Sequence, residues 1–75
     1  MLDKIINVLS KYSEYDKSKI TRDTTFVMDM GLNSIDVMKI VLELEDEFDI
    51  EFPEEDLLNI TTIGELEDEI KELMD

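Results

Sequence analysis

The apolar residues of this chain recur at helical spacing in three separate segments. Side chains three and four positions apart lie on the same face of an α-helix, so each stripe predicts a helix with one buried side. The spacing predicts helices over about 2–12, 34–48 and 62–74. The three stripes are Leu2, Ile5, Ile6, Leu9 and Tyr12; then Val37, Ile40, Val41, Leu44 and Phe48; then Ile63, Leu66, Ile70 and Leu73. Three such helices predict an all-α fold, a small antiparallel bundle.

Local signals mark where two of these helices begin. Asn33 is a favourable N-cap for the second helix, and Asp36 places an acid in its first turn. The last helix follows the sequence Thr62-Ile63-Gly64-Glu65, which fits the capping-box pattern.

The segment between these two helices predicts a loop and one short helix. Ile50 and Phe52 alternate with polar residues, but no second strand is available to pair with them. Pro53 suits the start of a short helix over about 54–58, whose first turn is acidic. We expect Leu57, Leu58 and Ile60 to pack inward.

Residues 13–33 show no sustained period and predict a long first loop. A loop of this length in a small domain is functional or is held by its own apolar residues. We expect Ile20, Phe26, Val27, Met28 and Leu32 to hold it. Gly31 allows a backbone conformation that other residues resist.

The second helix carries an additional apolar stripe, formed by Ile35, Met38 and Leu42. One stripe is enough to bury a helix in so small a domain. The additional stripe therefore either widens the core or is exposed to a partner.

Length and composition exclude several classes of function. A chain of 75 residues predicts one domain, 1–75. It contains no Cys, His or Trp, which excludes a zinc finger, a disulfide framework and a Cys–His or Ser–His–Asp catalytic set.

The net charge of −14 is confined to the second half of the chain. Residues 1–39 hold six acids and six bases, whereas residues 40–75 hold fifteen acids and one base, Lys71. Such acidity disfavours nucleic acid and an anionic membrane surface as partners. The chain has no apolar run long enough to span a bilayer and no signal peptide, so we expect a cytoplasmic monomer without membrane insertion.

The acidic clusters do not predict a metal site or an enzyme. An EF-hand loop needs Gly at position 6 and Glu at position 12, and the frames that begin at Asp16 and Asp23 have neither. The carboxylates fall on helix faces without a cleft large enough to bury a substrate, so a solvated face is the better interpretation.

Ser34 lies where the long loop meets the N-terminus of the second helix. A helix N-terminus favours a negative group, so this hydroxyl is well placed to carry a phosphate. A serine at a helix start is more often a simple cap, and a generic phosphorylation site is a further alternative. Spacing alone leaves all three open.

Four segments in order resemble the acyl carrier proteins and, more broadly, the phosphopantetheine-binding carriers. The family motif L-G-x-D-S-L before an acidic helix is similar to MGLNSIDVMKIVLELEDEF here, in residues 30–48. The loop before it contains Asp23-Thr24-Thr25-Phe26, and FDIEFPEED and ITTIGELEDEI follow it. The resemblance covers essentially the whole chain.

The resemblance implies that Ser34 is the attachment site of 4′-phosphopantetheine, which a phosphopantetheinyl transferase takes from coenzyme A. Gly31, Leu32 and Asn33 flank this site. The carrier itself would be non-enzymatic and would present acyl or aminoacyl thioesters to acyl-transferring, condensing or ligase enzymes with basic docking patches. The implied partner-binding residues are Ile35, Asp36, Met38, Leu42, Glu45, Asp46 and Glu47.

Three residues depart from the family pattern, namely Asn33, Ile35 and Lys39. They change the surface that partners recognise and leave the pathway open between fatty-acid, polyketide and peptide synthesis. D-alanyl and peptidyl carriers are alternatives within the family. A small acidic interaction module, in which Ser34 is only a helix cap, is the alternative outside it.

Overall fold

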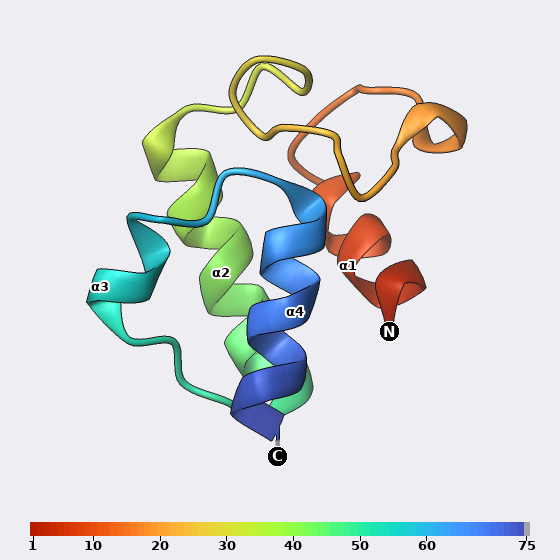
Figure 1. Ribbon diagram of the computed structural model, residues 1–75. Helices are drawn as coiled ribbons and strands as arrows, with labels where there is room; N and C mark the ends of the chain where they lie inside the picture. The colour runs from red at the N-terminus through yellow and green to blue at the C-terminus, as the bar shows by residue number, and fades with distance from the viewer. Residues whose placement is uncertain (75) are drawn as a thin grey trace.

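Three helices pack around one core, and two shorter helical segments lie in the connections between them (Figure 1). The computed structural model describes residues 1–74. The elements are α1 (Leu2–Leu9), a 3-10 helix η1 (Lys17–Lys19), α2 (Ser34–Phe48), α3 (Glu54–Leu57) and α4 (Ile63–Met74). Over the described residues the only β pairing is an isolated bridge between Thr25 and Thr62, so the predicted all-α fold is confirmed.

The three long helices do not all alternate in direction. In Figure 1, α1 runs opposite to α2, whereas α2 and α4 run the same way. The antiparallel arrangement that we predicted therefore holds for α1 against both α2 and α4, whereas α2 and α4 are parallel to each other. The connection through residues 49–62 carries the chain back along the bundle before α4 begins, and α3 lies within that connection.

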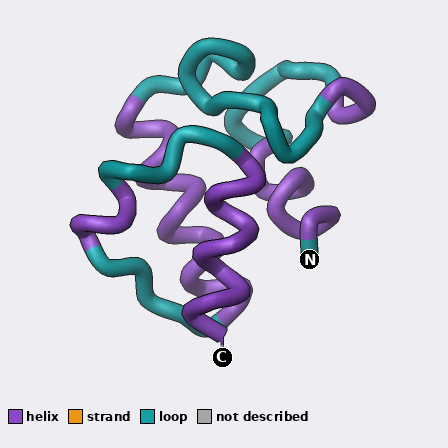
Figure 2. Tube along the Cα trace, viewed as in Figure 1, coloured by secondary structure: helices purple, strands orange, loops and turns teal. Residues whose placement is uncertain are grey.

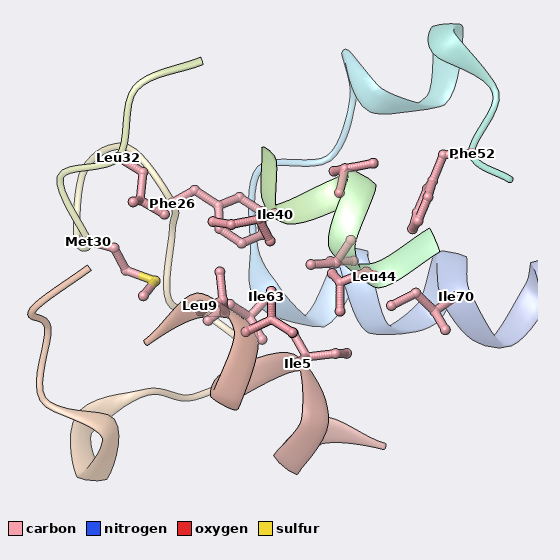
Figure 3. Packing of buried hydrophobic residues seen from close by; sticks show 13 residues of the cluster. Ile5, Leu9, Phe26, Met30, Leu32, Ile40, Leu44, Phe52, Ile63 and Ile70 are labelled. Carbon is pink, nitrogen blue, oxygen red and sulfur yellow. The ribbon is translucent and has the colours of Figure 1, made fainter. Parts of the chain in front are cut away.

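The core is formed by one face of each long helix together with residues of the connections (Figure 3). Ile5 and Leu9 of α1, Ile40 and Leu44 of α2, and Ile63, Leu66 and Ile70 of α4 are almost completely buried. These positions are those of the predicted stripes, because burial of an apolar face is what stabilises such short helices.

Helix α1 is shorter than predicted and ends at Leu9 instead of about residue 12. Beyond it the backbone tightens, since Lys11 N–H donates to Val8 O and Tyr12 N–H donates to Leu9 O, three positions back. This 3-10 tightening is a common helix ending. It turns Tyr12 toward α2, where its hydroxyl donates to Glu43.

The first loop is held by a different set of residues from the one predicted. Phe26 and Leu32 are buried as expected, but Val27 is 62% exposed and Met28 is 86% exposed. Met30, which we did not predict, is buried instead. The chain turns at residues 27–29, and the side chains of this turn are exposed to solvent. Such a turn has no periodic pattern from which burial could be predicted.

The region around α3 also differs from the prediction. Leu57 is half-buried, but Leu58 is 85% exposed and does not pack inward. Phe52, on the loop before α3, is buried in its place. A helix of four residues has no repeating face, so its packing cannot be predicted from spacing.

Backbone hydrogen bonds join the first loop to the start of α4. Phe26 N–H donates to Thr61 O (3.2 Å), Ile63 N–H donates to Thr24 O (3.0 Å) and Gly64 N–H donates to Arg22 O (2.8 Å). Figure 2 shows these loop segments gathered at the end of the bundle where α2 and α4 begin. The loop that leads to Ser34 is therefore fixed to the helix bundle.

Candidate functional site

Ser34 is the first residue of α2, and it is not the residue that caps the helix. Asn33 is the N-cap, because its side-chain oxygen accepts a hydrogen bond from Asp36 N–H (2.8 Å). Asp36 returns the contact by accepting from Asn33 N–H (3.4 Å), which completes a capping box. Ser34 is exposed, and its hydroxyl makes no hydrogen bond to any group in residues 1–74.

The turn before Ser34 is shaped by two residues. Gly31 has a φ of +69°, a left-handed conformation that L side chains rarely adopt. Asp29 accepts hydrogen bonds from Thr25 N–H (2.8 Å) and from the Thr25 hydroxyl (3.1 Å), and its own N–H donates to that hydroxyl. These contacts hold the chain in one conformation as it enters α2. No pattern in the sequence indicated this role of Asp29.

An apolar groove of about 420 Å³ opens beside Ser34, between the first loop, α2 and the α3 region. Ser34 lies on its rim. Its walls include exposed apolar side chains from all three segments, namely Val27, Met28, Met38 and Leu58. Exposed apolar side chains that meet at one place indicate a contact surface.

The interior beneath this groove is closed. The cavity between α2, α3 and α4 has a volume of only about 10 Å³. That is about the space of one water molecule. The cavity is lined by Phe26, Val37, Ile40, Val41, Leu57, Ile60 and Leu66. Any larger apolar group bound near Ser34 has room in the groove and none in this interior.

The additional stripe of α2 is exposed. Ile35 is 66% exposed, Met38 46% and Leu42 61%. The stripe therefore does not widen the core. Val27, Met28 and Leu58, which we had expected to be buried, extend this apolar surface around Ser34.

The acids predicted to face a partner are mostly engaged within the protein. Glu45 accepts a hydrogen bond from Phe52 N–H (2.7 Å), and Glu47 lies 3.5 Å from Lys4. Asp36 belongs to the capping box described above. Asp46 is exposed and has no such contact within residues 1–74.

Glu43, an acid of α2 that we had not assigned, contacts α1. The hydrogen bond from the Tyr12 hydroxyl, followed by that from Lys11, lowers the pKa of Glu43. The same bond raises the pKa of Tyr12, because the hydroxyl then donates to a carboxylate. This cluster joins α1 to α2.

In the part of the chain that the structure describes, no three side chains of Asp, Glu, Cys or His are placed to hold a metal ion. Likewise, none of the helices within residues 1–74 has the length and apolar character needed to cross a membrane. The arrangement around Ser34 is a free hydroxyl, a helix N-terminus and an apolar groove.

Comparison with known proteins identifies this arrangement. The sequence profile described as the phosphopantetheine attachment site matches residues 3–70. The structure is similar to that of the acyl carrier protein from Enterococcus faecalis, which was studied for its high thermal stability. The TM-score is 0.84 at 35% identity, over 96% of this chain and 91% of that chain. A match of this extent shows that the chain belongs to the acyl carrier protein family of phosphopantetheine-binding proteins.

Proposed function

We propose that Ser34 is the residue to which the prosthetic group is attached. The observation that supports this assignment is the exposed Ser34 hydroxyl, which is free of hydrogen bonds because Asn33 caps the helix in its place. A cap serine would use its oxygen to accept a backbone N–H. Ser34 instead keeps its oxygen available for a covalent bond.

Members of this family carry 4′-phosphopantetheine covalently, and the residues around Ser34 fit that group. The N-terminus of α2 favours the negative charge of a phosphodiester. The apolar groove begins at the same residue and fits the less polar part of the arm. When bound, the group supplies a thiol, which this Cys-free chain lacks.

Loading would proceed by attack of the Ser34 oxygen on the phosphorus of coenzyme A that carries the pantetheine. A new P–O bond forms to Ser34, and the P–O bond to 3′,5′-ADP breaks, so that the nucleotide leaves with the electron pair. The hydroxyl proton goes to a base of the transferase, because the chain has no His to accept it.

Carrier proteins of this family are non-enzymatic and work with partner enzymes. We propose that this chain carries acyl or aminoacyl thioesters on Ser34 and presents them to acyl-transferring, condensing or ligase enzymes. Tethering raises the effective concentration of the cargo at each of them. The exposed stripe of α2, Ile35, Met38 and Leu42, would form the central docking contact.

The attachment of the prosthetic group is tested by intact-protein mass spectrometry. The apo protein is incubated with coenzyme A, Mg²⁺ and a broad-specificity phosphopantetheinyl transferase. We expect a mass increase of one phosphopantetheine in the wild type and none in Ser34→Ala.

The matched control is Ser10→Ala, whose hydroxyl donates to Asn7 O at the C-terminal end of α1. It should gain the same mass as the wild type. A mass increase in Ser34→Ala would assign the attachment to another residue. Failure of the folded wild type to react with several transferases would favour the interaction module.

A further inference from the structure

Lys39 occupies the middle of the outward face of α2. It lies four residues after Ile35 and three before Leu42, so the three side chains follow one line along the helix. This line is opposite the buried residues Ile40, Val41 and Leu44. Lys39 is the only base among the five acids of α2, and it is exposed between two exposed apolar side chains.

The two carboxylates that could neutralise Lys39 within the helix are both engaged elsewhere. Asp36, three positions before it, closes the capping box with Asn33. Glu43, four positions after it, is held by Lys11 (3.2 Å) and by the Tyr12 hydroxyl of the α1 segment. Within residues 1–74, Lys39 itself forms no ion pair.

This arrangement has a consequence for docking. A partner that covers Ile35 and Leu42 also covers the Lys39 ammonium, and removing this charge from water is unfavourable without a counter-charge. A uniformly basic partner surface would in addition repel it. Discrimination between partners commonly uses such a repulsive element.

We propose that Lys39 is a specificity-determining residue, which selects partner enzymes that place a carboxylate opposite it and disfavours partners with a uniformly basic docking surface. The proposal rests on the carrier function proposed above. The docking face would then have a positive charge at its centre, and the acidic residues around it would supply a negative field.

The first test compares transferase kinetics for the wild type, Lys39→Glu, Lys39→Gln and Lys39→Arg. The probe is a broad-specificity transferase with a basic docking surface. Because association with such a partner is electrostatically steered, we expect Lys39→Glu to raise kcat/KM by roughly 3- to 10-fold at low salt. Lys39→Gln should be intermediate and Lys39→Arg unchanged, and high salt should reduce the differences.

The matched control is Lys19→Glu, which makes the same charge change on η1, away from α2. Its effect should be much smaller. If Lys19→Glu and Lys39→Glu raise kcat/KM equally, only net charge matters and the proposal is wrong. Loading of the wild type at Ser34 in the same assay separates this outcome from a failure of the carrier function.

The second test addresses the carboxylate. Each basic residue of the transferase docking surface is changed in turn to Glu, and each variant is assayed with wild type and Lys39→Glu. We expect at least one variant to reverse the preference and favour the wild-type carrier. If the effect of Lys39→Glu is the same with every transferase variant, Lys39 does not select a carboxylate.

Discussion

At the scale of single residues, Gly64 packs so closely against Arg22 that a larger residue would not fit. A methyl group on Gly64 would lie 2.9 Å from the Arg22 backbone oxygen and 2.9 Å from its Nε. The Arg22 guanidinium donates to the buried Glu67 (3.2 Å), to Gly64 O (3.2 Å) and to Asp68 (2.7 Å). Arg22 thus satisfies a buried carboxylate that would otherwise lack a partner.

We expect Gly64→Ala to destabilise the protein. The collision should cost about 1–3 kcal/mol, more than the gain of less than about 1 kcal/mol that alanine brings to a helix. The free energy of unfolding is measured by urea denaturation. Met74→Ala, an exposed change at the end of the same helix, is the control and should have little effect.

The identity of the colliding group can be checked in the same way. The cost of Gly64→Ala should be the same in an Arg22→Ala background as in the wild type, because the backbone oxygen of Arg22 remains in place. A much smaller cost in that background would mean that the Arg22 side chain causes the conflict.

The contacts of a residue could be predicted from the sequence where both partners lie close together in the chain. Asn33 as the N-cap and the Thr62–Glu65 capping box are both confirmed, because each involves residues three apart. The contact of Arg22 with Gly64 joins residues distant in sequence, and no local pattern indicates it.

At the scale of secondary-structure elements, α3 is a short helix with little internal stabilisation. It has four residues and no side-chain cap. Its position depends on its neighbours, chiefly the buried Phe52 and the half-buried Leu57. Across from it, Glu69 of α4 faces Asp56, so two carboxyls oppose each other between the elements.

This contact between Glu69 and Asp56 makes the stability of the folded protein depend on pH. Burial, followed by the Asp56 carboxyl and Glu72, raises the pKa of Glu69 above its usual value. The folded state therefore holds this proton more tightly than the unfolded state. Stability from this group is present at acid pH and is lost as the pH rises through the raised pKa.

Glu69→Gln should accordingly raise Tm at pH 7, and the gain should disappear at acid pH, where the wild-type carboxyl is protonated. Thermal denaturation followed by circular dichroism measures it. Glu14→Gln removes the same charge from the exposed first loop and is the control for net charge. Equal gains in both variants would show that the Asp56 contact has no role.

The boundaries of the elements were predicted best where the periodic pattern was long. α2 begins and ends at the predicted residues, Ser34 and Phe48. α1 ends early and Leu58 points outward because both positions are set by tertiary contacts, such as that of Tyr12 with Glu43. Whether the additional stripe of α2 would be buried or exposed could not be predicted either, because that depends on how the helices pack.

At the scale of the whole molecule, the neutral first half is tied to the acidic second half by ion pairs. Lys4 contacts Glu47, Lys11 contacts Glu43, and Arg22 contacts Glu67 and Asp68. Each pair joins a base before residue 40 to an acid after it. Most of the acidic residues have no such partner in the described chain, so repulsion outweighs these attractions.

We therefore expect added salt to stabilise the protein. At pH 7 the net charge is −14, and screening should relieve more repulsion than it weakens in the exposed ion pairs, which contribute about 0–1 kcal/mol each. Tm is measured in low and high sodium chloride, and millimolar divalent cations should act in the same direction.

The same titration near pH 4 is the control, because the isoelectric point is about 4.1 and little net repulsion remains there. The salt effect should be much smaller at that pH. A Tm that does not respond to salt at pH 7 would contradict a dominant role for repulsion.

The hydrogen bonds between the first loop and α4 have a consequence for how the chain folds. Every other backbone hydrogen bond outside the helices, within residues 1–74, joins groups no more than six positions apart. Helices and turns of that kind form rapidly, because little chain entropy is lost in closing them. The bonds at Thr24, Phe26 and Gly64 instead close a long segment that contains all of α2 and α3. Forming that closure is the topologically demanding step of folding, and the segment that it encloses is the one that holds Ser34 and the groove.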